Sequence, residues 1–139
     1  MHTEILYVED NPADVFLLGE AIRRKSNAVL LSTVDDGESA LSFLNGAKLL
    51  PCAIVLDVGL PRIDGTEVLR VIKSNPSFRC VPTAVFADQS VQRQMKRDGH
   101  LPELFLTKPS DLDGYDTVAG QILALCDPAY YLKAAEQSA

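Results

Sequence analysis

The sequence predicts an α/β protein built on a doubly wound, five-stranded parallel sheet with the strand order 2-1-3-4-5. Short, continuous apolar runs alternate with longer amphipathic stretches, which is typical of repeated strand–helix units. A chain of 139 residues with 47% hydrophobic content can bury one substantial core. We therefore expect one domain over residues 1–127, followed by a short tail over residues 128–139.

The expected strands are short runs rich in Val, Leu and Ile. The first, third and fourth runs are mostly apolar throughout, as strands covered by helices on both faces should be. The five expected strands are residues 5–8, 29–34, 53–56, 82–86 and 104–107.

Capping signals between the strands predict where helices begin. Asn11 precedes Pro12, and Val15, Leu18 and Ile22 then recur at helical spacing, so a first helix is expected there. Further helices are expected to open at residues 36–39, 64–67 and 111–112 and to end at 45–46, 75–76 and 127–128.

The fourth helix is the weakest expectation. Residues 90–98 contain only Val91 and Met95 as apolar anchors, so this helix has little to bury against the sheet.

Composition excludes some classes of function. The chain has 19 acidic and 13 basic residues and a net charge of −6, which disfavours nucleic-acid binding, because that depends on cationic contacts to phosphate. No run approaches the roughly 20 apolar residues that a membrane span needs, and no basic segment precedes an apolar one at the start. We expect a cytoplasmic protein without membrane contact.

The three cysteines are widely spaced and form no CxxC pair. Cys52, Cys80 and Cys126 have only His2 and His100 as potential companion ligands. The sequence therefore predicts neither a zinc site nor a disulfide framework, and we expect the cysteines to be small apolar residues in a reducing compartment.

Candidate site residues lie where strands end, because ligands of doubly wound sheets bind beyond the carboxyl ends of the strands. The residues that follow the first, third, fourth and fifth strands are Glu9 and Asp10, Asp57, Ala87 and Asp88, and Lys108.

In the predicted strand order the first and third strands are neighbours, which would bring the carboxylates of Glu9, Asp10 and Asp57 together. Such carboxylates repel one another unless a cation shares the site, and Mg²⁺ is the natural cation for oxygen ligands. Lys108 could pair with an aspartate before reaction and with a phosphoryl oxygen afterwards. The set indicates acyl-phosphate chemistry with Asp57 as the nucleophile.

Each of these residues also has an ordinary structural explanation. Glu9 and Asp10 could form a solvated loop before a capped helix, and Lys108 could belong to an ordinary loop. Asp57 ends a buried apolar strand, where a carboxylate requires a partner or a role. Their joint occurrence at three strand ends favours the functional interpretation.

A set of motifs occurs in order along the chain: Glu9-Asp10-Asn11-Pro12-Ala13-Asp14, Asp36-Gly37-Glu38, Leu56-Asp57, Leu60-Pro61-Arg62-Ile63-Asp64-Gly65 and Thr107-Lys108-Pro109. Over about residues 4–126 they resemble the response regulator receiver domain of two-component signalling, which implies its flavodoxin-like fold. The first and fourth motifs are most similar to small stand-alone regulators that serve phytochrome-like histidine kinases.

The resemblance implies specific roles in a Mg²⁺-dependent phosphorylation. Asp57 would be the phospho-acceptor, and Asp10 and Asp57 would bind Mg²⁺ directly. Glu9 would act mainly through a metal-bound water, and the Gly59 carbonyl would complete the protein ligands. Lys108 would contact the phosphoryl group.

Two further implications concern the fifth strand and the loop after it. The Lys108–Pro109 peptide bond would be cis, although an X–Pro bond is cis in only about 5% of cases. Phe105 lies where the family has its switch aromatic, while packing in the core explains an aromatic residue on a strand equally well.

The chain departs from the family pattern after the fourth strand. Ala87 stands where the family usually has Thr or Ser, so no hydroxyl can bond a phosphoryl oxygen. Asp88 stands where the family has a small residue, and its charge should slow phosphorylation by a dianionic donor or weaken the product. An alternative alignment with Thr83 as the switch residue fails, because it would remove the end of the strand.

Residues 87–99 look shorter than the family norm, and residues 100–103 look like an insertion. A short or irregular fourth helix is therefore expected. Because the family signals through the fourth helix, the fifth strand and the fifth helix, this would change the usual output surface.

The leading hypothesis is a single-domain, cytoplasmic receiver, a phosphoprotein of a phosphorelay that assists its own phosphorylation and is not an enzyme. Its donor would be a sensor histidine kinase, more specifically a phytochrome-like one, and it would signal by contact with a downstream protein of unknown identity, with homodimerisation left open. The alternative is a phosphorylation-independent interaction module, suggested by Ala87 and Asp88.

Two other classes are disfavoured. A phosphatase of the haloacid dehalogenase kind has a second Asp two residues after its nucleophile, where this chain has Gly59. A flavin-binding flavodoxin-like protein would need a phosphate loop that tolerates Glu9, Asp10 and Asp14.

Overall fold

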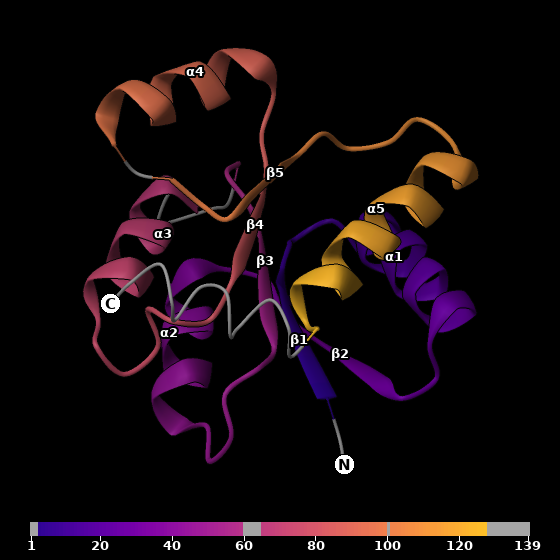
Figure 1. The fold of residues 1–139 in the computed structure, drawn as a ribbon, viewed down its shortest axis with the longest axis horizontal. Coiled ribbons are helices and arrows are strands. Elements are labelled where there is room, and N and C mark those ends of the chain that lie inside the picture. Colours follow the sequence, from indigo (N-terminus) through magenta and orange to yellow (C-terminus); the bar gives the residue numbers. More distant parts are fainter. Residues whose placement is uncertain (1–2, 60–64, 100, 128–139) are drawn as a thin grey trace.

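A computed structural model of the chain describes residues 3–59, 65–99 and 101–127. Five parallel strands form one sheet in the order β2-β1-β3-β4-β5, which confirms the predicted fold (Figure 1). The strands are β1 (Thr3–Val8), β2 (Val29–Val34), β3 (Ala53–Asp57), β4 (Thr83–Phe86) and β5 (Leu104–Leu106). The helices are α1 (Pro12–Lys25), α2 (Gly37–Gly46), α3 (Gly65–Ser74), α4 (Gln89–Asp98) and α5 (Leu112–Leu125).

Helices cover both faces of the sheet. Helices α1 and α5 lie side by side on one face, and α2, α3 and α4 lie on the other (Figure 1). Successive residues of a strand point to opposite faces, so Ile5 and Tyr7 of β1 pack toward α1 and α5, while Leu6 and Val8 pack toward α2 and α3. All four side chains are fully buried, which explains why β1 is apolar throughout.

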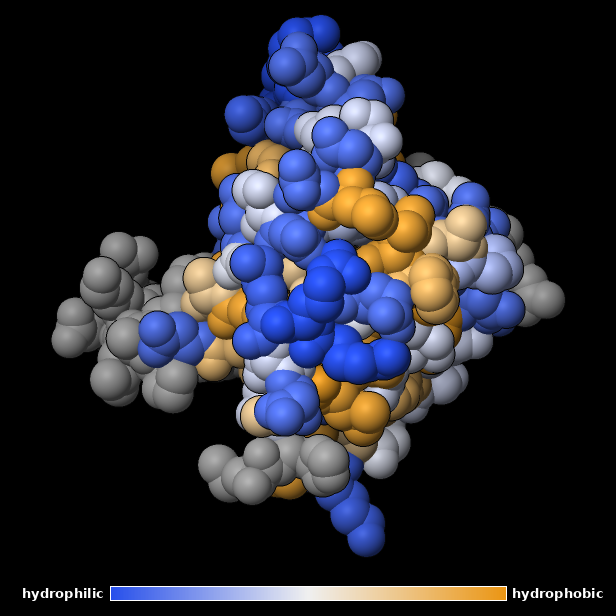
Figure 2. Space-filling view, turned by 90° about the vertical axis from the view of Figure 1, so that its right-hand side faces the viewer, coloured by the Kyte–Doolittle hydropathy of each residue, from blue (hydrophilic) through white to orange (hydrophobic). Residues whose placement is uncertain are grey.

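The edge of the sheet at β2 is less completely covered. The face formed by α1, β2 and α5 presents hydrophilic side chains between hydrophobic patches (Figure 2). Phe16 of α1 and Leu30 of β2 are exposed large apolar side chains. Among the described residues, no helix is both long and apolar enough to cross a membrane.

Helix α4 differs from the expectation of a short or irregular helix. It is a regular helix of ten residues, the same length as α2 and α3. The Asp88 side chain caps its start by accepting a hydrogen bond from Val91 N at 2.9 Å, and Gly99 ends it with a left-handed φ of 79°. These two caps and buried Met95 compensate for the poor apolar face.

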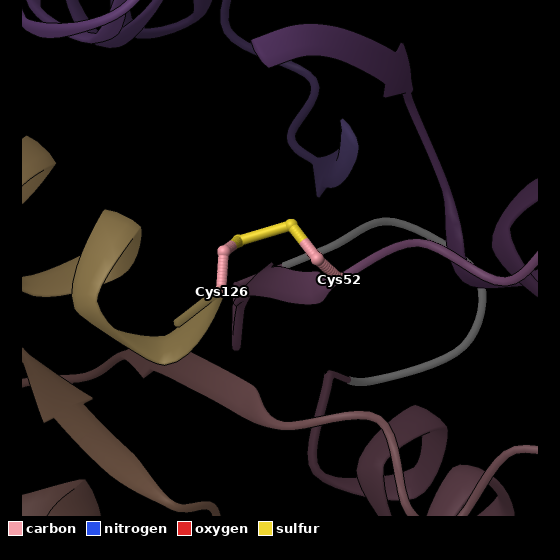
Figure 3. Close-up of a disulfide and its surroundings, with 2 residues drawn as sticks. All are labelled: Cys52 and Cys126. Carbon is pink, nitrogen blue, oxygen red and sulfur yellow. A yellow bond between two sulfur atoms is a disulfide. The ribbon is translucent and has the colours of Figure 1, made fainter. Parts of the chain in front are cut away.

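The prediction of three free cysteines was wrong. Cys52, just before β3, forms a disulfide with Cys126, which follows α5 (Figure 3). Their Cα atoms lie 4.9 Å apart although 74 residues separate them in sequence, because α5 packs along the sheet with its end beside the start of β3. Cys80 is free and exposed.

Some predictions fall on parts of the chain that the structure does not describe. They are the motif over residues 60–64, the start of the inserted segment at residue 100, and the tail over residues 128–139.

Candidate functional site

The candidate site lies at the carboxyl ends of β1 and β3. Val8 pairs with Leu56 in the register of these neighbouring strands, so Glu9 and Asp57, one residue further on, lie close together. One carboxylate oxygen each of Glu9, Asp10 and Asp57 lies within 4.8 Å of the others. The structure therefore brings together the three acidic residues that the sequence analysis selected.

Lys108, in the loop between β5 and α5, reaches the same cluster. Its Nζ atom lies 2.5 Å from Glu9 Oε1, 2.6 Å from Asp14 Oδ2 and 2.8 Å from Asp57 Oδ2. An ammonium group has three N–H donors, so all three have a carboxylate partner. Partial burial works to lower the pKa of Lys108, but hydrogen bonds with Asp14, Asp57 and Glu9 outweigh it and raise the pKa.

Glu9 is the most deeply buried carboxylate of the site. Its Oε1 accepts a hydrogen bond from the Tyr7 hydroxyl at 3.1 Å, and its Oε2 accepts from the backbone N–H groups of Asp10 and Asn11 at 3.2 and 3.4 Å. Burial raises the pKa of Glu9, and the hydrogen bond from Lys108 offsets only part of that effect. Burial also raises the pKa of Tyr7, so its hydroxyl remains a donor.

Each carboxylate oxygen of Asp57 accepts a hydrogen bond from a described residue. The backbone N–H of Gly59 donates to Oδ1 at 3.0 Å, and Lys108 donates to Oδ2 at 2.8 Å. Burial would raise the pKa of Asp57, but the hydrogen bonds from Lys108 and Gly59 outweigh it and lower the pKa. Asp57 is therefore an ionised carboxylate at neutral pH, as a nucleophile must be.

Gly65 controls how closely α3 approaches the end of β3. A Cβ atom at this position would lie 2.5 Å from the Asp57 carbonyl oxygen and 2.6 Å from Val58 Cα. Gly65 N also donates to the Val58 carbonyl at 3.3 Å. Only glycine allows this close approach of α3 to the backbone of Asp57 and Val58.

The acidic residues fit a hard divalent cation. Their oxygens are the ligand type that Mg²⁺ prefers, and Asp10 is exposed, so water can complete the coordination. The Gly59 N–H is already bonded to Asp57, which leaves its carbonyl as the group predicted to bind metal.

The position of Ala87 offers the site no hydroxyl. Ala87 is buried, and its N–H donates to the Leu106 carbonyl at 3.0 Å. Asp88 uses its carboxylate as the N-cap of α4, a structural role that the sequence analysis did not assign. Phe105 is half-buried against the core beneath α4, with Lys96 Nζ 5.5 Å from its ring centre, an arrangement that packing explains.

One expectation from the family pattern needs correction, and one residue of the site was missed. The Lys108–Pro109 peptide bond is trans, the form that X–Pro bonds ordinarily favour. The sequence analysis assigned no role in the site to Asp14, yet it contacts Lys108 directly and accepts a hydrogen bond from the Tyr115 hydroxyl at 3.3 Å. Its place in the first turn of α1, at the carboxyl edge of the sheet, was the available signal for this contact.

Comparisons with known proteins bear on this arrangement. The model of the response regulator receiver domain family matches residues 5–117. The chain is 34% identical over 97 residues to the probable methanogenesis regulatory protein FilR2 of Methanothrix harundinacea, covering 67% of this chain and 63% of FilR2. It is 38% identical over 88 residues to response regulator Rcp1 of Synechocystis sp., covering 58% of each chain. The matched region thus spans less than two thirds of either relative.

Solved structures of similar proteins have the same fold. The phosphorylated cyanobacterial phytochrome response regulator RcpA is 30% identical, with a TM-score of 0.78 over 88% of this chain and 91% of RcpA. The Mn²⁺-bound form of Rcp1 is 29% identical, with a TM-score of 0.75 over 88% of this chain and 92% of Rcp1.

Proposed function

Because the chain belongs to the response regulator receiver domain family, we propose that Asp57 accepts a phosphoryl group from a sensor histidine kinase in a Mg²⁺-dependent reaction. The observation that carries this proposal is the position of Asp57, ionised and bonded to Lys108, beside the carboxylates of Glu9 and Asp10. Receiver domains are signalling domains, so the protein acts through protein contact and is not an enzyme with a turned-over substrate.

In the proposed reaction a carboxylate oxygen of Asp57 attacks the phosphorus atom. The new P–O bond forms as the bond between phosphorus and the imidazole nitrogen of the kinase's phosphohistidine breaks, and the imidazole leaves. The Gly59 N–H holds Asp57 Oδ1 in place, and the Lys108 ammonium offsets negative charge on the phosphoryl oxygens. Glu9, Asp10, Asp57 and the Gly59 carbonyl would hold Mg²⁺, which would supply further positive charge.

A phytochrome-type kinase is the proposed donor. RcpA, which has a similar solved structure, is a phosphorylated cyanobacterial phytochrome response regulator. We propose that the receiver domain covers residues 1–127 and acts in the cytoplasm. It would signal by contact with a downstream protein, and homodimerisation is left open.

The test is a Mg²⁺-dependent gain in mass. The purified chain is incubated with acetyl phosphate, with Mg²⁺ or with EDTA, and its intact mass is recorded beside Asp57→Asn. We expect one added phosphoryl group that requires both Mg²⁺ and Asp57. A phosphorylated species that persists in Asp57→Asn contradicts the assignment of the acceptor.

A second function, a phosphorylation-independent interaction module, is favoured by Ala87 and Asp88. Ala87 has no hydroxyl that could donate a hydrogen bond to a phosphoryl oxygen, and Asp88 adds a negative charge just after β4. On this view the partner binds the parent chain, Asp57→Asn and Asp57→Glu with equal affinity.

Asp88 can be tested separately from its capping role. Asp88→Ser retains a good N-cap while removing the charge, whereas Asp88→Ala removes both and costs about 1 kcal/mol of stability. If charge repulsion limits phosphorylation, both variants take up phosphate faster than the parent by the same factor. If neither the parent nor these variants is phosphorylated, the second function is the better account.

A further inference from the structure

Asp14 is a carboxylate partner of Lys108 that lies outside the cluster able to hold a metal. Glu9, Asp10 and Asp57 form that cluster, and Asp14 is not part of it. Lys108 nevertheless bonds to Asp14 Oδ2 at 2.6 Å, as closely as it bonds to Glu9 and Asp57. Lys108 therefore has two partners that a metal would also use and one that it would not.

Hydrogen bonds hold Asp14 both at its backbone and at its carboxylate. Its backbone N–H donates to the Asn11 side chain at 3.3 Å in the cap of α1, where the helix dipole favours a negative charge. Its second oxygen, Oδ1, accepts from the Tyr115 hydroxyl at 3.3 Å. Tyr115 is a buried residue of α5, which packs against α1. The Asp14 carboxylate is therefore held between two packed helices and not on a loop.

Lys108 and a divalent cation would compete for the carboxylates of Glu9 and Asp57. A cation bound to Glu9 and Asp57 withdraws those carboxylates from the ammonium group and repels it as a like charge. A lysine with no other partner would either oppose metal binding or move away into solvent. Neither outcome suits a residue that must stay beside Asp57.

We propose that Asp14 is a positioning residue that retains Lys108 beside Asp57 when a divalent cation occupies the carboxylates of Glu9, Asp10 and Asp57. The proposal rests on the proposed function and extends it to a residue with no contact to the cation. It has two consequences: Asp14 reduces the competition between Lys108 and the cation, and it keeps the ammonium within reach of a phosphoryl oxygen.

A double-mutant cycle tests whether Asp14 acts through Lys108. The Kd for Mg²⁺ is measured by calorimetry in the parent, Asp14→Asn, Lys108→Met and the double variant. We expect Asp14→Asn to weaken Mg²⁺ binding by about fivefold or more when Lys108 is present. Without Lys108 the same change should weaken binding by about twofold at most, through lost long-range attraction alone.

The proposal would be overturned if Asp14→Asn weakened Mg²⁺ binding by the same factor with and without Lys108. Asp14 would then act as a distant charge or as part of the fold. Lys108→Gln provides a second background if Lys108→Met folds poorly. Asp14→Glu, which keeps the charge on a longer side chain, should recover part of the lost affinity. Tyr115→Phe should weaken Mg²⁺ binding in the same direction by a smaller factor, because it frees Asp14 without removing it.

The metal readout separates this proposal from the proposed function. If Asp57 is phosphorylated but the two factors are equal, the role of Asp14 fails and the function stands. If Mg²⁺ binds and the factors differ while Asp57 takes no phosphoryl group, the role of Asp14 stands and the function fails. If the parent binds no Mg²⁺ at millimolar concentration, both fail.

Discussion

The two ends of the parallel sheet contribute to the stability of the fold in opposite directions. At the carboxyl ends of β1 and β3, three carboxylates contact one lysine and Asp10 lies beside two of them, so the arrangement depends on balanced charges. At the amino ends, the Cys52–Cys126 disulfide joins β3 to α5, and Cys52 N donates to the Glu4 carbonyl at 2.8 Å. Clustered like charges oppose folding, whereas a crosslink and closed hydrogen bonds favour it.

This difference indicates a division of roles within one small domain. In the proposed function the charged end carries the chemistry, and its clustered carboxylates reduce stability, as functional sites often do. The opposite end is crosslinked and hydrogen-bonded, so it can stabilise the domain. Three changes test this comparison, beginning with the largest expected effect.

Removing the Cys52–Cys126 disulfide should lower the free energy of unfolding by about 2–4 kcal/mol, because the crosslink closes a long loop in the unfolded chain. The measurement is urea unfolding of the parent and of the Cys52→Ala, Cys126→Ala double variant under non-reducing conditions. Cys80→Ser is the matched control, since Cys80 is exposed and free. Equal stability of the double variant and the parent would show that the amino end does not depend on the crosslink.

Gly65→Ala should cost about 1–3 kcal/mol, because the new methyl group would overlap the backbone at Asp57 and Val58. It should also slow phosphorylation, since the end of β3 must shift to make room. Gly46→Ala is the control, because a Cβ there meets nothing within 4 Å. The measurements are the unfolding curves and phosphorylation rates of both variants. If Gly65→Ala has the stability and phosphorylation rate of the parent, the close approach of α3 is refuted.

Lys108→Met should cost about 1–2 kcal/mol in metal-free protein, less than for a fully buried pair because the lysine is one-third exposed. The loss arises because Glu9, Asp14 and Asp57 would face one another without the ammonium group. Added Mg²⁺ should restore stability more in this variant than in the parent, which thermal unfolding with and without Mg²⁺ would measure. Lys48→Met, at an exposed site, is the control.

The main features of the fold could be predicted from local sequence. Apolar runs such as residues 53–56 identify strands because a strand covered on both faces has almost no polar position. Asp57 and Glu9 were selected because parallel strands end at one edge of the sheet, so position along the chain alone places them there. Helix α4 was underestimated because two capping residues, Asp88 and Gly99, outweigh its sparse apolar face.

The sequence by itself thus determined the strand order and the acidic cluster with Lys108. The order follows from the repeated strand–helix units, and the cluster follows from the residues at the strand ends. Only the tertiary structure decided the partners that packing brings together. Cys52 meets Cys126 across 74 residues, Asp14 meets Lys108 across 94, and Tyr115 meets Asp14 across 101. These contacts depend on how α1 and α5 are rotated and packed against the sheet and against each other. No local pattern specifies the packing of two helices that are distant in sequence.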